Sequence, residues 1–259
     1  MKIVTIGGGE IGRTKIMNDG SVHKYPVETM EIDQEIIRLS GKKNPKLLLL
    51  ATASGDSPGY FDAAKQHFGD TLGCQVSWLK LVNESPSIEE IRTAILGTDI
   101  IYVGGGNTNN MLQIWKTKGV DKALKDALDK GIVLSGLSAG ANCWFKHYCT
   151  DSAAIDLGAE NGTHLSVWDG LGFINGICAP HTMTEALRLP YAKEMLLKKY
   201  PNDILYGIDD FAAVIFEDGK VRSIVSSIGK EKGAKVHLLS VKNNQIIEID
   251  INSNFIKQV

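Results

Sequence analysis

Residues 132–142 read IVLSGLSAGAN, an apolar run followed by a serine between two glycines, Gly136-Leu137-Ser138-Ala139-Gly140. The run predicts a strand and the residues after Gly140 predict a helix, so the glycines stand at a sharp strand-to-helix turn. A G-x-S-x-G turn holds the serine hydroxyl exposed at the end of a sheet, with glycines where neighbouring backbones leave no room for a Cβ. The new helix also directs its free N–H groups at any anion formed nearby. Ser138 is therefore a candidate nucleophile; the alternative is that it only caps the helix.

The composition is that of an ordinary globular protein. The chain has 259 residues, 43% hydrophobic and 22% charged, with a formal net charge of -2. These values favour neither a nucleic-acid nor a membrane partner. No stretch approaches the roughly 18 apolar residues of a spanning helix, and the N-terminus runs into a strand instead of a signal peptide, so we expect a cytoplasmic protein. The four cysteines lack close-paired spacing, which favours reduced thiols and no metal site.

Strand-like and helix-like segments alternate along the chain, which is typical of parallel strands with helices on both faces of the sheet. Near the C-terminus, residues 211–225 predict a hairpin closed by a D-G turn, and residues 236–241 and 246–251 predict two further strands. We therefore predict an α/β fold of three layers, with a mostly parallel sheet, helices on both faces and C-terminal antiparallel strands. No linker or repeat divides the chain, so we expect a single domain over residues 1–259.

Two glycine-rich loops follow predicted strands. Gly7-Gly8-Gly9-Glu10-Ile11-Gly12 matches the dinucleotide fingerprint, but residues 13–26 contain Gly20 and Pro26 and show no helical period, so the helix that would hold a pyrophosphate is missing. We interpret these glycines as a loop at the carboxyl edge of the sheet. The second loop, Gly104-Gly105-Gly106-Asn107-Thr108, presents bare amides that suit an anion or an oxyanion; alternatively, it is a simple entry to a helix. If the strand order is simple, it lies beside Ser138.

A serine hydroxyl needs a base to remove its proton and an acid to orient that base. His181 is the best candidate base, because it follows a predicted strand directly at the edge where Ser138 should lie; His147 and His164 remain alternatives. Asp151 and Asp210 are both candidate acids, and sequence spacing does not separate them.

The sequence resembles peptidase family S51, which contains dipeptidase E and, more distantly, cyanophycinase. The resemblance rests on Val103-Gly104-Gly105-Gly106-Asn107-Thr108, on the serine turn with Ala141 and Asn142, and on Ala179-Pro180-His181, in that order. It implies a class I glutamine amidotransferase-like fold, with Ser138 as nucleophile and His181 as base. It also implies an oxyanion hole formed by Gly105, Gly106 and the Ala139 amide.

The same resemblance implies a serine exopeptidase of short peptides, with no cofactor or metal, that acts on a small peptide as monomer or homodimer. Dipeptidase E cleaves peptides with an N-terminal aspartate, so Arg188, with Asn107, is a predicted substrate contact. Asp151 is favoured for function, with Asp210 as co-candidate. Two alternatives stay open: a nucleotide or small-ligand binding protein that uses the glycine loops, and an inactive relative of the peptidases or of the class I amidotransferases.

Overall fold

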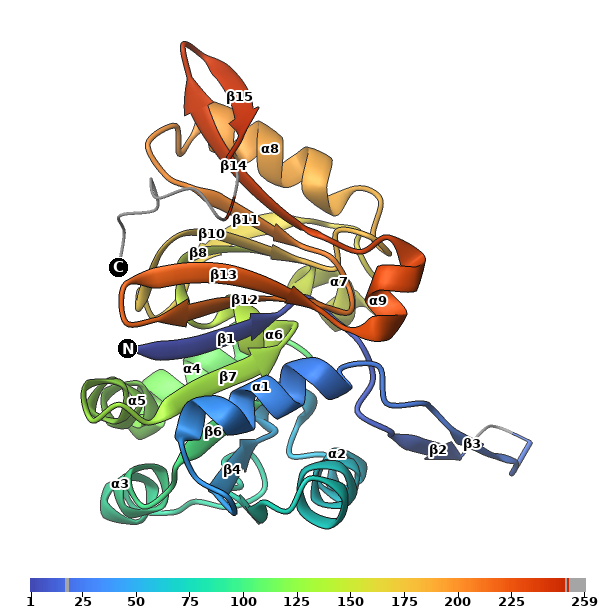
Figure 1. Ribbon diagram of the computed structural model, residues 1–259, viewed down its shortest axis with the longest axis vertical. Helices are drawn as coiled ribbons and strands as arrows, with labels where there is room; N and C mark the ends of the chain where they lie inside the picture. The colour runs from blue at the N-terminus through green and yellow to red at the C-terminus, as the bar shows by residue number, and fades with distance from the viewer. Residues whose placement is uncertain (17–18, 250, 252–259) are drawn as a thin grey trace.

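Two β-sheets carry the fold of the computed structural model, which describes residues 1–16, 19–249 and 251 (Figure 1). In spatial order the seven strands of the first sheet are β13 (Lys220–Val225), β12 (Ala212–Glu217), β1 (Lys2–Ile6), β7 (Val133–Leu137), β6 (Ile100–Val103), β4 (Lys46–Leu50) and β5 (Gln75–Trp78). The last five of these strands are parallel, whereas β12 pairs antiparallel with β1 and β13 pairs antiparallel with β12.

Helices cover both faces of this parallel centre, as the alternating pattern predicted. In β4, Leu47 and Leu49 pack on one face, and Leu48 and Leu50 pack on the other, which explains the unbroken run of leucines. The first face is covered by α1 (Met30–Ser40), α2 (Pro58–Ala64) and the π-helix η2 (Lys65–Thr71). The second face is covered by α3 (Ile88–Leu96), α4 (Thr108–Lys118) and α5 (Val120–Asp129).

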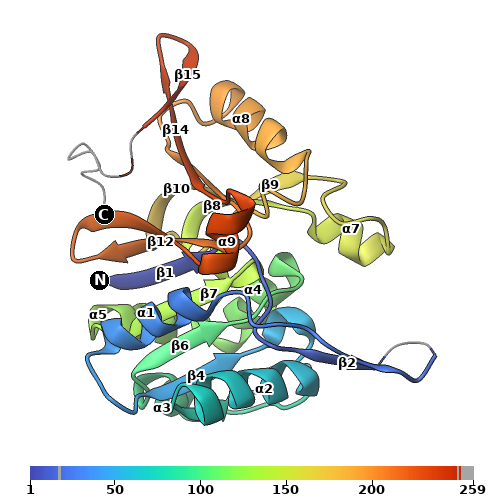
Figure 2. The ribbon, with the colours of Figure 1, turned by 45° about the vertical axis from the view of Figure 1, so that its right-hand side comes forward.

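The second sheet was not separated from the first by the sequence pattern. Its six strands are, in spatial order, β15 (Gln245–Glu248), β14 (Val236–Lys242), β11 (Leu205–Ile208), β10 (Ile174–Pro180), β8 (Phe145–Thr150) and β9 (Ser166–Asp169). Only β8, β10 and β11 run parallel to one another. Helix α8 (Arg188–Lys198) covers its outer face (Figure 2). The remaining short helices are η1 (Thr52–Ser54), α6 (Ala139–Asn142), α7 (Ser152–Leu157) and α9 (Ser227–Lys232).

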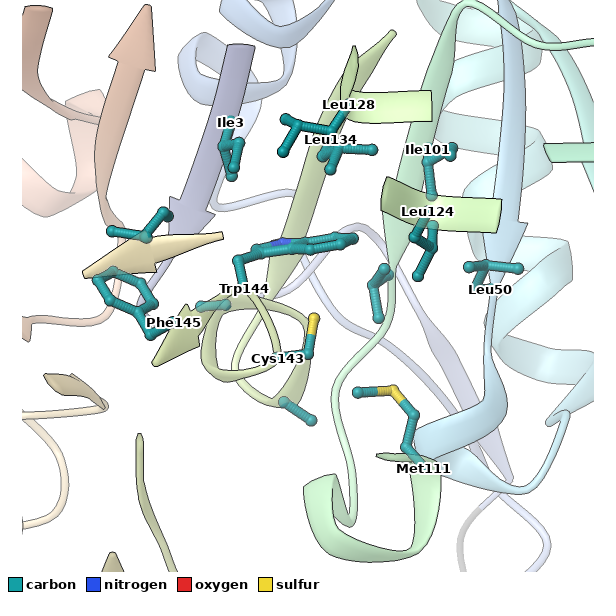
Figure 3. Close-up of a cluster of buried hydrophobic side chains, with 14 of the residues drawn as sticks. Ile3, Leu50, Ile101, Met111, Leu124, Leu128, Leu134, Cys143, Trp144 and Phe145 are labelled. Carbon is teal, nitrogen blue, oxygen red and sulfur yellow. The ribbon is translucent and has the colours of Figure 1, made fainter. Parts of the chain in front are cut away.

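The two sheets share one hydrophobic core, and the residues just after the serine turn lie at its centre. Figure 3 shows the indole of Trp144 in the middle of this cluster. The neighbouring ring of Phe145 contacts Tyr206 of the second sheet and Phe216 of the first, with centroids 5.2 and 5.9 Å apart. The chain segment that follows Ser138 therefore holds the sheets together through buried aromatic contact.

Side-chain contacts and a hairpin shape the connections between these elements. Strand β5 ends at Trp78, and the Asp56 carboxylate then accepts the amides of residues 81–83 and turns the chain. A hairpin of β2 (Thr14–Ile16) and β3 (Val22–Lys24) follows the first glycine loop and projects from the molecule. The last predicted strand, 246–251, includes residue 250, which lies outside the described residues.

Within the part of the chain that the structure describes, no helix combines the length and the apolar character needed to cross a bilayer.

We expect Gly140→Ala to destabilise the fold. A Cβ at residue 140 would lie 2.2 Å from the carbonyl oxygen of Val103, so β6 and α6 would have to separate. Forced overpacking of this kind costs about 1–3 kcal/mol or more, measurable as the free energy of unfolding in urea. The control is Gly59→Ala in α2, where the new Cβ has nothing closer than 4.0 Å. That change should stabilise the helix by about 0.5–1 kcal/mol. Equal stabilities for the two variants would contradict the close packing at the turn.

Candidate active site

The serine turn has the geometry that its glycines predicted. Strand β7 ends at Leu137, and Ser138 has φ 58° and ψ −109° before α6 begins at Ala139. This positive φ is strained for a residue with a side chain, and strain of this kind is concentrated at functional sites. Gly136 pairs with Val103 across β7 and β6, and a Cβ on it would lie 2.5 Å from the Gly140 carbonyl oxygen. The backbone contact therefore forces the Ser138 side chain outward.

A chain of two hydrogen bonds runs from the serine through a histidine to a carboxylate. The Oγ of Ser138 lies 2.8 Å from Nε2 of His181, and Nδ1 of His181 lies 2.7 Å from Oδ1 of Asp210. The carboxylate accepts from Nδ1–H, which leaves Nε2 free to accept the serine proton. Thr184 donates its hydroxyl to the other oxygen of Asp210 at 2.7 Å. Of the residues predicted from the sequence, the structure thus brings Ser138, His181 and Asp210 together.

The first glycine loop lies behind this histidine–carboxylate pair. A Cβ on Gly8 would stand 2.1 Å from Oδ1 of Asp210 and 2.5 Å from Nδ1 of His181. The Gly8 carbonyl also accepts the Phe211 amide at 2.9 Å, which fixes the chain beside Asp210. The loop is thus at the sheet edge, as we interpreted it, and its bare backbone makes room for the pair.

The second glycine loop lies on the other side of Ser138. A Cβ on Gly105 would be 3.4 Å from the Cβ of Ser138, and one on Gly106 would be 2.2 Å from the Ala53 carbonyl oxygen. Ala139 is the first residue of α6, where N–H groups have no acceptor within the helix. The amide of Gly105, however, donates to the hydroxyl of Tyr60 at 3.2 Å. The predicted oxyanion residues therefore surround the serine, with one of their amides already paired.

An open cleft of about 560 Å³ exposes these groups. Its lining includes Ser138, His181, Asp210, Gly105 and Gly106, together with residues that the sequence reasoning missed. Gly9, Glu10 and Ile11 belong to the first glycine loop and Leu137 belongs to the serine turn, although none of them was predicted as a site residue. The other lining residues lie in segments that carry no motif; they are Arg13, Glu28, Ser54, Tyr60, Ala63, Asn161, Thr184 and Phe211.

Arg188 and Asp151 lie together, away from the cleft lining. The Arg188 side chain is only 2% exposed and forms ion pairs with Glu185 and with Asp151, the latter at 3.1 Å. It also donates to the Cys149 carbonyl at 2.9 Å. Although burial raises it, the pKa of the Asp151 carboxyl is held below its ordinary value by Arg188 and by the amide of Gly162. The guanidinium that we predicted to bind substrate is thus occupied within the protein.

Asn107 also faces the protein rather than the cleft. Its side chain is buried, caps α4 by accepting the Asn110 amide, and donates to Asp156 of α7 at 2.8 Å. Asn107 therefore fastens α7 to the start of α4, whereas Asp151 binds the Gly162 amide at 2.9 Å. Between these two attachments lies Asn161, which does line the cleft.

The protein environment stabilises the charged form of Asp210. Burial opposes ionisation, since the residue is only 5% exposed, but the hydrogen bonds from His181 and Thr184 outweigh it and hold the pKa of Asp210 below its ordinary value. A carboxylate with a lowered folded-state pKa contributes stability that is complete above its unfolded pKa and is lost as the pH falls through the folded pKa.

Asp210→Asn should therefore flatten the acid limb of the stability profile. The free energy of unfolding of the wild type should fall as the pH drops below the ordinary carboxyl value of 3.8, and the variant should lose less over that range. The measurement is urea unfolding between about pH 5 and pH 2.5. Asp62→Asn, an exposed change in α2, serves as the control and should follow the wild type. Superimposable profiles for Asp210→Asn and the wild type would show that the His181 pairing does not stabilise this carboxylate.

The fold and the sequence both have known counterparts. The putative peptidase E protein from Listeria monocytogenes superimposes with a TM-score of 0.60 at 20% identity, over 87% of this chain and 98% of that one. A peptidase from an acI-B1 Actinobacterium superimposes with a TM-score of 0.65 at 19% identity, over 95% and 93% of the two chains. At these identities the similarity establishes the fold.

Sequence similarity establishes the family. The chain is 34% identical over 235 residues to the uncharacterized peptidase YgaJ of Bacillus subtilis, which covers 91% of this chain and 95% of that protein. The family model described as Peptidase family S51 matches residues 16–224, which include the second glycine loop, the serine turn and the His181–Asp210 pair. This chain belongs to peptidase family S51.

Proposed function

We propose that this protein is a serine peptidase that removes residues from short peptides, with Ser138 as nucleophile, His181 as base and Asp210 as the acid that orients it. The observation that carries the proposal is the unbroken hydrogen-bond chain from Ser138 Oγ to His181 and on to Asp210. A base within about 3 Å of a serine hydroxyl, itself oriented by a buried carboxylate, is the arrangement that activates serine for acyl transfer.

Each group then has a defined task. Ser138 Oγ attacks the peptide carbonyl while its proton passes to Nε2 of His181, and His181 returns that proton to the departing amine. Asp210 keeps Nδ1 protonated and stabilises the imidazolium that forms. The free amides at the start of α6 and the Gly106 amide are the proposed donors to the carbonyl oxygen as it becomes negative, since both segments line or adjoin the cleft. His181 then takes a proton from water as the water attacks the acyl-enzyme, and it returns that proton to Ser138 Oγ as the product acid leaves. The volume of the cleft, about 560 Å³, supports a short peptide as substrate.

The contacts of Arg188 do not favour a preference for an N-terminal aspartate. Because Arg188 is buried against Glu185 and Asp151, its charge is compensated within the protein. Among the described residues that line the cleft, Arg13 is the one arginine or lysine, and it pairs with Glu10. We therefore propose short peptides as the substrate class and leave the residue at the scissile bond to a substrate panel.

Ser138→Ala should reduce turnover by about 10³- to 10⁶-fold, because the nucleophile and the acyl-enzyme are lost while binding remains. The assay measures the leucine released from dipeptides X-Leu, with every amino acid tested at position X. The control is Ser77→Ala in β5, the edge strand at the far end of the sheet, which should retain wild-type turnover. Full activity in Ser138→Ala, or no hydrolysis of any dipeptide by the wild type, would reject the proposal; the latter result would favour an inactive relative.

Asp210→Asn and Asp151→Asn should fail in different ways. We expect Asp210→Asn to lower kcat by about 10⁴-fold, because the histidine loses its orienting charge. Asp151→Asn should instead lower the free energy of unfolding by roughly 1–3 kcal/mol, because it removes a charged partner of the buried Arg188. The two variants are compared by kcat on one dipeptide and by urea unfolding. The opposite pattern would transfer the acid role to Asp151.

A further inference from the structure

Tyr60 of α2 is held in the cleft by contacts that no motif of the sequence indicated. Its ring lies against the backbone of Gly104, where a Cβ would stand 2.9 Å from the ring carbon that bears the hydroxyl. Its hydroxyl accepts the amide of Gly105 at 3.2 Å. The bare backbone at residue 104 therefore makes room for the phenol and brings its oxygen to the loop beside the nucleophile.

The hydrogen bond to Tyr60 changes what Gly105 can do. While its amide donates to Tyr60, the same N–H is not available to a substrate oxygen. The phenol, in contrast, uses only an acceptor site in this bond and keeps its own proton to donate. Hydrogen bonds in series polarise one another, so an O–H that accepts an amide proton becomes a stronger donor.

The position of the hydroxyl suits this task. Gly105 packs against Ser138, as its hypothetical Cβ at 3.4 Å from the serine Cβ shows, and Tyr60 and Ser138 line the same cleft. Burial raises the pKa of Tyr60 to about 12, although the Gly105 amide and the nearby Arg13 act in the other direction. The phenol therefore stays protonated throughout the neutral range and can donate.

We propose that the Tyr60 hydroxyl is a donor of the oxyanion hole, which hydrogen-bonds the carbonyl oxygen of the substrate as Ser138 attacks, with the Gly105 amide supporting it from behind. The inference rests on the proposed function, since it requires Ser138 to be the nucleophile. No proton leaves Tyr60 in this step; the hydroxyl shares it with the oxyanion and recovers it fully when the carbonyl re-forms.

Tyr60→Phe tests the proposal, because it removes the donor and keeps the ring. Loss of one oxyanion donor lowers kcat by about 10²- to 10³-fold, and KM should change little because the contact forms mainly in the transition state. The control is Tyr102→Phe in β6. Tyr102 is buried, its hydroxyl has no partner among the described residues, and it does not line the cleft, so kcat should stay at the wild-type value.

A tetrahedral inhibitor separates a catalytic role from a structural one. A dipeptidyl boronic acid, which mimics the oxyanion on Ser138, should bind Tyr60→Phe more weakly by a factor similar to the loss in kcat/KM. As a second route, Gly104→Ala should displace the ring and lower kcat. Its effect should be less than additive with Tyr60→Phe, because both changes remove the same contact.

The outcomes are distinguishable. If the wild type hydrolyses dipeptides and Tyr60→Phe does so at the same kcat, the oxyanion role fails and the proposed function stands. A higher kcat in Tyr60→Phe would also overturn the inference, since it would mean that the phenol blocks the Gly105 amide. If the wild type hydrolyses no dipeptide, the proposed function and this inference fail together.

Discussion

Close contact between three backbones at the end of β7 is the constraint on which the site depends. Strands β6 and β7 pair in register at Val103 and Gly136, and the backbone of Gly140 packs against the carbonyl of the same Val103. No side chain fits between them, so the turn must be tight and Ser138 must take a positive φ. The same contact places the glycine loop after β6 beside the serine. A packing requirement inside the sheet therefore produces both the exposed hydroxyl and the amides around it.

The proposed base and acid reach this turn from the junction of the two sheets. His181 follows β10 in the second sheet, and Asp210 lies in the connection that leaves β11 of the second sheet for β12 of the first. The hydrogen bond between them consequently joins the sheets at the point where Gly8 also arrives from β1. The aromatic contacts of Phe145 fix the same two sheets from within the core. Movement of one sheet against the other would separate His181 from Ser138.

A second polar network holds one wall of the cleft. The Arg188 guanidinium, compensated by Glu185 and Asp151, ties the start of segment 151–162 to α8. Asn107 ties α7 in the same segment to α4 through Asp156. Buried charges are stable only when they are paired, and here the pairing fastens the segment that carries Asn161. Residues that look like substrate contacts in the sequence thus support the cleft from outside it.

The sequence by itself determined the α/β pattern, the serine turn with its flanking glycines and the glycine loop beside it, and it indicated His181 as the candidate base. These features are local: apolar runs, glycine positions and the residue that follows a strand depend on near neighbours in the chain. Tertiary structure alone placed Asp210, and not Asp151, against His181, turned Arg188 and Asn107 away from the cleft, and brought Tyr60 to Gly105. Each of these outcomes depends on contacts between segments distant in the chain, and a buried side chain takes whichever partner the packing of those segments places beside it.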